Sequence, residues 1–456
     1  MLRSYSDAIR QFNFVSSQGE RSSDQNTFTI MVGRNGTGKS RLLRSVVINL
    51  LSDVVDPDCF TREERINFNT NHRGELDFQW HPTRIICAST SPFDRFPLPR
   101  RDQATESYSY LGLRGLPSAN LGLAYMSRVI FSLLNAAHSS REQAASIESV
   151  LRYLGYEGAL GATLQLAPSR FVDELIETGN PVQLIQEFVG RSAGPFHADN
   201  VSGLKNLLNF TEPDLREVID AARRIAYAAP NRRLSLTVNG YGLKIDSMAS
   251  VEIDRVLLLA RSGLLRLREV VLHRHEFGQP IKLHEASSGE QAVVMGLLGI
   301  GSHITDGSLI CIDEPEVCLH PEWQEKYIEL LFNTFRQYRG CHFLIATHSP
   351  QIVAQIPEGN CYVMSMEDGI AKSASDYSQR SIDFQLAEVF NAPGFRNEYL
   401  SRIALNAFAR VSKTKRFDEQ SRGDLAILRR VVVEMRANDP LRDLITALEE
   451  MASTYE

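Results

Sequence analysis

A glycine-rich loop near the N-terminus restricts the fold more than any other part of the sequence. Residues Gly33 to Ser40 read G-R-N-G-T-G-K-S and match G-x-x-x-x-G-K-[ST] at every fixed position. An apolar, β-branched run, Thr27 to Val32, precedes the loop, and apolar residues at helical spacing follow from Ser40 to Leu51. The sequence therefore predicts a strand, a phosphate-binding loop and a helix, in that order.

The residue types in this loop suit a triphosphate. Glycines let backbone N–H groups turn toward phosphate oxygens, and the helix N-terminus adds partial positive charge. We expect Lys39 to reach the β- and γ-phosphates of ATP and Ser40 to ligate Mg²⁺. A chance glycine-rich turn is the alternative, and the flanking patterns disfavour it. The residues expected to bind the nucleotide are Asn35, Gly36, Thr37, Gly38, Lys39 and Ser40.

Two adjacent carboxylates end a second segment. Gly307 to Ile312 is predicted to form a turn that leads into a short buried strand, and Asp313-Glu314 follows. A carboxylate at such a strand end holds the water shell of Mg²⁺, which is the role predicted for Asp313. Glu314 is expected to point elsewhere and to orient or deprotonate the attacking water. A solvent-facing acidic pair is the alternative.

A histidine follows a further apolar run, His342 to Ala346. A lone histidine is usually structural, but Thr347-His348-Ser349-Pro350 comes after a predicted buried strand and downstream of the Asp-Glu pair. This order favours His348 as a residue that hydrogen-bonds the γ-phosphate or the attacking water.

Together these segments resemble the ABC/SMC-type ATPases, whose motifs occur in the order Walker A, Q-loop, signature, Walker B, D-loop and His-switch. The segment Ala286 to Glu290 aligns with the signature L-S-G-G-[QE], with Ala286 in place of leucine and Ser288 in place of the first glycine. Ser287, Ser288 and Gly289 are the expected contacts, and which serine meets the γ-phosphate stays open. Helix capping is the alternative role for these serines.

The resemblance implies a shared active site. In this superfamily the signature acts on nucleotide bound by the other subunit, so Ser287 is expected to serve ATP held by Lys39 of a second copy. A homodimer or a higher homo-oligomer around an ATP sandwich follows. The apolar run Ala292 to Ile300 is predicted to be the helix whose N-terminus faces that phosphate.

The segment Glu314 to Pro321 points to a subgroup. Its Glu-Pro-Glu followed by Leu-His-Pro resembles the AAA-type ATPases of the OLD, RecF and Septu group rather than transporter subunits. His320 would lie in the D-loop as a dimer-contact or structural residue. The Q-loop position, Arg84 to Pro97, has no glutamine, so Ser91 or Asp94 is expected to take its role. That run is most similar to Septu-type and retron-associated phage-defence ATPases.

The predicted fold class is α/β, an ABC-type P-loop ATPase head with a mixed sheet flanked by helices. Residues 1–100 are expected to form the N-terminal lobe with the Q-loop region, and residues 281–375 the C-terminal lobe. Between them, residues 101–280 are expected to be a mainly helical insertion with a β-hairpin around Asn239-Gly240. Residues 376–456 are predicted to be helical and partner-binding. Heptads do not persist, so no long coiled-coil arm is expected.

Composition narrows the expected setting. The chain has 456 residues, a formal net charge of -6 and no run of about 18 apolar residues, which disfavours a basic surface field and a membrane span. Its six cysteines lack paired spacing, which suits a reducing cytoplasm. The OLD proteins that this chain resembles carry a Toprim nuclease domain, which needs an Asp-x-Asp motif to bind metal ions. The one such motif here, Asp56-Pro57-Asp58, is predicted to be a turn. The chain is therefore expected to have no nuclease site of its own.

The motif set and the resemblance to phage-defence ATPases imply a cytoplasmic ATPase that regulates a separate nuclease subunit, of HNH or Toprim type, in defence against phage. Nucleic acid, as DNA, RNA or retron msDNA, stays open as a further partner. A RecF-like DNA-binding ATPase of DNA repair is the alternative, and a scaffold that holds nucleotide as a structural ligand is the third.

Overall fold

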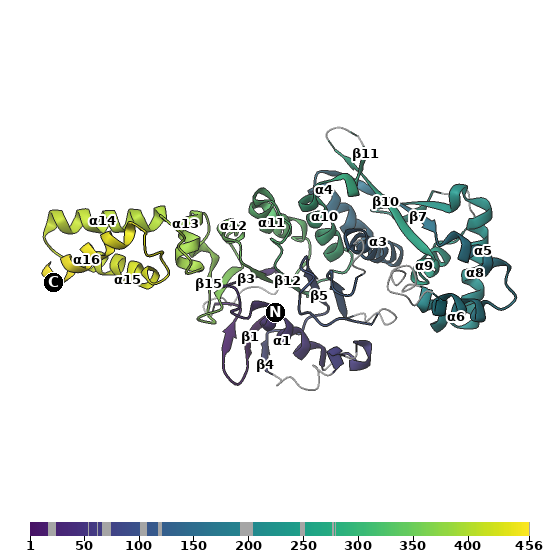
Figure 1. Ribbon diagram of the computed structural model, residues 1–456, viewed down its shortest axis with the longest axis horizontal. Helices are drawn as coiled ribbons and strands as arrows, with labels where there is room; N and C mark the ends of the chain where they lie inside the picture. Colours follow the sequence, from purple (N-terminus) through teal and green to yellow (C-terminus); the bar gives the residue numbers. More distant parts are fainter. Residues whose placement is uncertain are drawn as a thin grey trace.

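The computed structural model describes residues 1–16, 24–52, 54–61, 63–65, 74–100, 107–116, 121–191, 204–246, 251–275, 278 and 280–455. Figure 1 shows an elongated molecule with the central sheet in its middle. The C-terminal helices α14, α15 and α16 lie at one end, and α5, α6 and α8 lie at the other.

A seven-stranded mixed sheet organises the centre, in the order β15-β14-β3-β13-β12-β5-β6. All neighbours from β14 to β6 are parallel, and β15 pairs antiparallel with β14. Every residue of β3, β5, β12 and β13 is buried, as expected for strands covered on both faces. The strands are β3 (Thr27–Val32), β5 (Ile85–Ser89), β6 (Tyr108–Leu111), β12 (Leu309–Asp313), β13 (His342–Thr347), β14 (Cys361–Ser365) and β15 (Ala371–Ser373).

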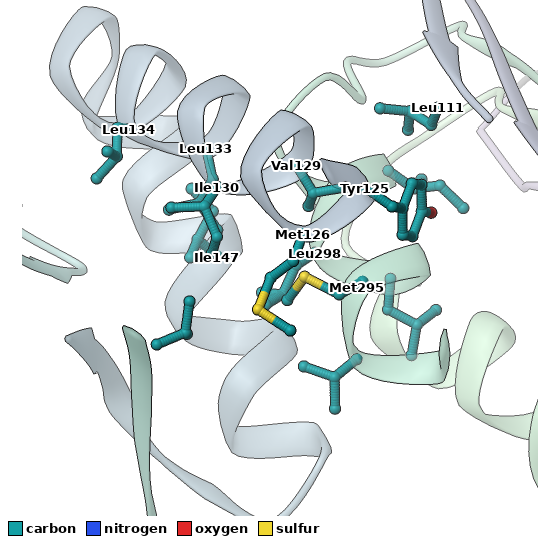
Figure 2. Close-up of a cluster of buried hydrophobic side chains, with 14 of the residues drawn as sticks. Leu111, Tyr125, Met126, Val129, Ile130, Leu133, Leu134, Ile147, Met295 and Leu298 are labelled. Carbon is teal, nitrogen blue, oxygen red and sulfur yellow. The ribbon is translucent and has the colours of Figure 1, made fainter. Parts of the chain in front are cut away.

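Helices cover the two faces of this sheet because alternate strand residues point to opposite sides. In β12, Leu309 and Cys311 face α1 (Lys39–Ser52), while Ile310 and Ile312 face the other layer. That second layer consists of α3 (Leu121–Ser139), α4 (Arg141–Tyr153), α10 (Ser288–Gly301) and α11 (Pro321–Thr334). Figure 2 shows side chains of α3, among them Met126 and Ile130, packed with those of α4 and α10.

Two antiparallel sheets flank the central one. β1 (Leu2–Ser6), β2 (Gln11–Asn13) and β4 (Glu75–Phe78) form the first, in the order β2-β1-β4. The second lies in the insertion, in the order β11-β10-β7-β8-β9. Its strands are β7 (Tyr156–Leu166), β8 (Arg233–Asn239), β9 (Gly242–Ile245), β10 (Leu265–Arg274) and β11 (Pro280–Lys282), and its helices are α5 (Ser169–Glu177), α6 (Pro181–Arg191), α8 (Glu212–Ala228) and α9 (Ile253–Arg261).

The predicted α/β class is confirmed, and so are the strand and helix on either side of the phosphate loop. The predicted hairpin is also present, since β8 and β9 pair across Asn239 and Gly242. The difference lies in β7, β10 and β11, which enlarge this hairpin to five strands. In β7 the buried residues Leu160, Ala162, Leu164 and Leu166 alternate with more accessible ones, a strand pattern next to helical segments. The proposed four-part division of the chain stays a prediction.

The C-terminal residues fold into helices, as the sequence predicted. After β15 come α13 (Ile382–Phe384), α14 (Glu398–Thr414), α15 (Glu419–Val432) and α16 (Leu441–Tyr455). The last three pack around their own apolar core, which includes Leu400, Leu428 and Leu448. Among the residues that the structure describes, no helix combines the length and the apolar character needed to cross a bilayer.

Two histidines with lowered pKa values predict acid sensitivity of the fold. Burial lowers the pKa of His342 to about 3, with the N-terminal amine adding to the effect, and that of His303 to about 4, with Arg84 adding. The unfolded chain takes up these protons near pH 6.5, but the native state does not. The unfolding free energy should therefore fall as pH drops below about 6.5, by about 1.4 kcal/mol per pH unit for each histidine until its folded pKa is reached.

Thermal unfolding between pH 7.5 and 4.5 measures this slope. The variant His303→Gln should show a shallower fall than the wild type, and a variant of the half-exposed His284, His284→Gln, should not. Parallel curves for the wild type and His303→Gln would contradict the assignment.

Candidate nucleotide-binding site

The predicted site residues meet where four parallel strands end. The carboxyl ends of β3, β13, β12 and β5 lie side by side at one edge of the sheet, the usual ligand position in α/β folds. A cavity of about 420 Å³ opens there. It is lined by Asn35, Gly36, Gly38, Lys39, Ser40, Arg41, Arg95, Glu314 and His348.

The phosphate loop owes its shape to two glycines. Gly36 has φ 83° and Gly38 has φ 101°, both in the region that side chains with a Cβ rarely adopt. A Cβ on Gly36 would meet no atom within 4 Å, so the backbone angle rather than space requires glycine there. The Thr37 hydroxyl donates to the Arg34 carbonyl at 2.9 Å and closes the turn. The loop thus presents its backbone to the cavity at the start of α1.

Lys39 folds back over this loop. Its Nζ donates to the carbonyl oxygens of Gly33 at 2.8 Å and Arg34 at 3.3 Å, and the residue is buried. Burial lowers the pKa of Lys39 to about 8, and the carboxylates of Glu316, Glu314 and Asp313 oppose that shift. The ammonium group therefore lies at the loop, in a position to meet phosphate oxygens.

His348 lies between Lys39 and Glu314. Its Nδ1 is 3.1 Å from Lys39 Nζ, and its Nε2 is 3.7 Å from Glu314 Oε1. Burial and then the Lys39 charge lower the pKa of His348 to about 4, so the ring is neutral near pH 7. Because an ammonium group only donates, Nδ1 accepts and the proton lies on Nε2. The N–H of His348 is thus directed toward Glu314 and the cavity.

Ser40 and Asp313 form the pair predicted to hold Mg²⁺. The Ser40 hydroxyl donates to Asp313 Oδ1 at 3.0 Å, across 273 residues of sequence. Burial raises the pKa of Asp313 to about 7, the Ser40 hydrogen bond opposes the rise, and Glu314 and Asp94 add to it. A divalent cation would compensate this crowded negative charge.

The donor set fits Mg²⁺ bound together with nucleotide. Mg²⁺ takes oxygen ligands, keeps several waters, and is often held by one or two protein groups plus substrate phosphates. Within the part of the chain that the structure describes, no group of three or more His, Cys, Asp or Glu residues could hold a metal ion. One hydroxyl and one carboxylate therefore leave most of the coordination to phosphate and water.

The backbone after β12 separates the two carboxylates. Glu314 has φ 51°, a left-handed angle that costs roughly 1–2 kcal/mol outside glycine. Its N–H donates to the Ala346 carbonyl at 2.9 Å, and the Thr90 hydroxyl donates to its carbonyl at 3.3 Å. These bonds from β13 and the end of β5 hold the turn. As a result Asp313 meets Ser40, while Glu314 lines the cavity.

The residues suggested for the Q-loop role have other partners. The carboxylate of Asp94 is buried and accepts hydrogen bonds from the Tyr110 hydroxyl and, at 3.1 Å, from the Phe96 N–H. The Ser91 hydroxyl accepts from the Phe93 N–H at 3.3 Å. From this loop it is Arg95 that lines the cavity. Arg95 was not predicted from the sequence, although an arginine near a phosphate-binding site is a usable indication of a phosphate contact.

The signature residues lie outside the cavity of their own chain. Ser287 caps α10, because its hydroxyl accepts from the Glu290 N–H at 3.2 Å, and both Ser287 and Ser288 are exposed. Gly289 is buried, and a Cβ there would lie 3.5 Å from the carbonyl of Cys318, the residue before the predicted D-loop. The capping role is therefore observed, and the contact with a second copy stays a prediction. His320 caps α11 in the same way, through the Glu322 N–H at 3.5 Å.

Two further residues of the site region were not anticipated from the sequence. Glu316 bonds to the Thr347 hydroxyl and to the His348 N–H. Arg34, within the phosphate loop, forms an ion pair with Glu434 at 2.9 Å and donates to the Asn391 carbonyl. The second glutamate of the Glu-Pro-Glu segment could have drawn attention to the contact that Glu316 makes. The sequence held no signal for the contacts of Arg34.

The phosphate loop, the Ser40–Asp313 pair and the cavity at the strand ends together form a candidate nucleotide-binding site. Residues 183–354, less than half of the chain, match the protein family described as "AAA domain, putative AbiEii toxin, Type IV TA system". The "Retron Ec83 probable ATPase" of Escherichia coli is 30% identical over 91 residues. That alignment covers 18% of this chain and only 16% of the relative.

Solved structures of low identity were also found. An ATP-binding cassette of an ABC transporter in its ADP conformation is 12% identical with a TM-score of 0.26, over 83% of this chain and 87% of the other. The Smc head domain of Pyrococcus furiosus, bound to the C-terminal domain of ScpA, is 11% identical with a TM-score of 0.27, over 82% and 97%. Stu0660 of Streptococcus thermophilus is 8% identical with a TM-score of 0.32, over 100% and 94%. Scores this low do not establish a common fold over the aligned lengths.

The Ser40–Asp313 pair predicts how a variant depends on metal. Asp313→Asn should weaken Mg²⁺-dependent ATP binding by about 10-fold or more. The carboxylate that would hold Mg²⁺, directly or through a water molecule, loses its negative charge in this variant. Binding without Mg²⁺ should be unchanged or stronger, since a negative charge near the phosphates is gone. Titration with a fluorescent ATP analogue, with Mg²⁺ and then with EDTA, measures both affinities. Asp306→Asn, in the turn before β12, is the control, and an equal loss in both conditions would refute the metal role.

Proposed function

We propose that this chain binds ATP with Mg²⁺ and hydrolyses it at the composite interface between two copies of itself. The observation that supports this most is the convergence of Lys39, His348 and Glu314 on one cavity, beside the Ser40–Asp313 pair. These side chains come from three separate strand ends, and each is of the type that phosphoryl transfer to water requires.

The roles follow from the geometry. Lys39 would bind the β- and γ-phosphates, and Ser40 and Asp313 would hold Mg²⁺, which would supply positive charge to offset that of the phosphates. Glu314 orients the attacking water and accepts its proton. His348 is neutral and carries its proton on Nε2, so it donates to the γ-phosphate or to the water. Asn35, Gly36, Thr37 and Gly38 contribute the loop that surrounds the phosphates.

The second copy supplies the signature. Ser287 and Ser288 are exposed at the start of α10, and neither lines the cavity of its own chain. A helix N-terminus with exposed hydroxyl groups favours an anion. We therefore propose that α10 of one copy faces the γ-phosphate bound by the other, in a homodimer or a higher homo-oligomer.

We further propose a role in phage defence, with a separate nuclease of HNH or Toprim type as the regulated effector. The similarity to a retron ATPase supports this, although it spans one short segment. The Asp56-Pro57-Asp58 segment is a turn, in which the Asp56 side chain accepts from the Asp58 N–H at 2.9 Å, as the sequence predicted. The helices α14 to α16 are the proposed docking region for the effector, in the cytoplasm, with DNA, RNA or retron msDNA as the proposed trigger.

Glu314→Gln tests the hydrolytic role. The variant keeps the size of the side chain but cannot accept the proton of water, so we expect turnover to fall by about 100-fold or more with ATP affinity retained. ATP should then remain bound and the dimer should accumulate. Nucleotide content of the purified protein and its mass by light scattering with Mg²⁺-ATP measure this.

Lys39→Ala is the matched control, because it should bind no ATP and stay in its nucleotide-free assembly state. In cells that carry the neighbouring genes, both variants should lose protection in a phage plating assay. Wild-type turnover by Glu314→Gln would remove Glu314 from the mechanism.

Mixing two inactive variants tests the shared site. Ser288→Arg should block the signature, because the exposed position would project a long cation toward the partner, and Lys39→Ala should empty the phosphate loop. In a mixed dimer, one site combines both lesions and the other has neither. Turnover should therefore reappear on mixing, at about one quarter of the wild-type rate or less. If each chain used its own signature, mixing would restore nothing.

A further inference from the structure

The Glu-Pro-Glu segment contains a carboxylate that none of the steps above uses. Glu316 lies between β12 and α11, two residues after Glu314, and it does not line the cavity. Its side chain is directed toward the end of β13. There Oε2 accepts from the Thr347 hydroxyl at 2.9 Å, and Oε1 accepts from the backbone N–H of His348. The carboxylate thus joins two neighbouring residues at the point where the strand ends.

These bonds fix the place from which the His348 side chain departs. The Thr347 hydroxyl also accepts from the Ser349 N–H at 3.0 Å, so residues 347 to 349 form one hydrogen-bonded unit with Glu316. The imidazole of His348 then reaches Lys39 at 3.1 Å and Glu314 at 3.7 Å. We propose that Glu316 is a positioning residue that holds His348 between the phosphate-binding lysine and the proton-accepting glutamate.

The chemistry of the contact requires a carboxylate. Two donors, an O–H and an N–H, converge on its two oxygens, and an ionised carboxylate only accepts. A glutamine would direct its own N–H₂ group at one of these donors. Burial raises the pKa of Glu316, and the hydrogen bonds from His348 and Thr347 oppose that rise. Charge-assisted bonds of this kind are about twice as strong as neutral ones, so they suit a fixed position.

A second anchor holds the same loop on its other side. The Ser349 hydroxyl donates to Gln324 Oε1 of α11 at 2.7 Å and caps α12 (Pro350–Ala354) through the Ile352 N–H. This anchor follows His348 in the chain and does not touch its backbone N–H. Loss of Glu316 should therefore release the His348 position while the loop as a whole stays attached, which makes the variant Glu316→Gln informative.

Steady-state ATP hydrolysis by the full chain tests the proposal, which rests on the proposed function. Glu316→Gln should lower kcat by about 10- to 100-fold, because a misplacement of about 1 Å costs that much, while KM changes by less than about 3-fold. Thr347→Val should lower kcat less, since it removes one of the two bonds. Glu322→Gln is the matched control, because Glu322 is an exposed glutamate of α11 paired with Lys326.

The double variant decides whether Glu316 acts through His348. If it does, Glu316→Gln combined with His348→Ala should turn over no more slowly than His348→Ala alone, within about 2-fold. Losses that multiply would overturn the proposal. Melting curves for each variant show whether the protein is folded, and Thr347→Val keeps the test decisive if Glu316→Gln does not fold.

A readout that needs no turnover separates this proposal from the proposed function. In protein labelled with ¹⁵N at histidine, the ring signals of His348, assigned from His348→Ala, should shift in Glu316→Gln and stay in place in Glu322→Gln. A wild-type chain without ATPase activity would refute the proposed function, and these signals would still report the position of the ring. Unchanged His348 signals in Glu316→Gln would overturn the positioning role.

Discussion

Parallel pairing of four buried strands is the constraint on which the site depends. β3 pairs with β13, β13 with β12 and β12 with β5, in a register that sets Thr347 opposite Val32 and Asp313 opposite Ala346. Each strand ends at the same edge of the sheet, so the next residue of each chain segment enters the same small volume. The apolar layers on both faces hold this register, because a slip by one residue would exchange the two buried faces.

The parts of the site that lie at the ends of strands could be predicted from the sequence. The contacts between Lys39 and His348 and between Ser40 and Asp313 join residues 309 and 273 positions apart. They could be expected because Asp313 and His348 lie at or just after the ends of apolar runs short enough for buried strands. Lys39 and Ser40 belong to the phosphate-loop motif that follows another such run. The glycines at positions 36 and 38 were likewise predictable, since a backbone angle requires them.

Other contacts depend on partners that no local pattern identifies. Asp94 was one of two residues expected to take the Q-loop role, and its carboxylate bonds to the hydroxyl of Tyr110, which the neighbouring strand β6 brings within reach. Glu316 bonds in part to a backbone N–H, and a backbone group has no signature in the amino-acid sequence. The strand β7 has glycines at 158 and 161 and lies between helices, so its alternation was weak beside the helical periodicity around it.

The ion pair between Arg34 and Glu434 connects the phosphate-binding loop to the C-terminal helices. Arg34 belongs to the loop that surrounds the phosphates, and Glu434 follows α15, so one contact belongs to both the nucleotide site and the C-terminal helices. If a nucleotide at the loop strengthens or weakens this contact, it changes the affinity of the C-terminal helices for a partner. That partner then changes the affinity for the nucleotide by the same factor. Such a coupling is reciprocal, and it weakens with salt because both side chains are partly exposed.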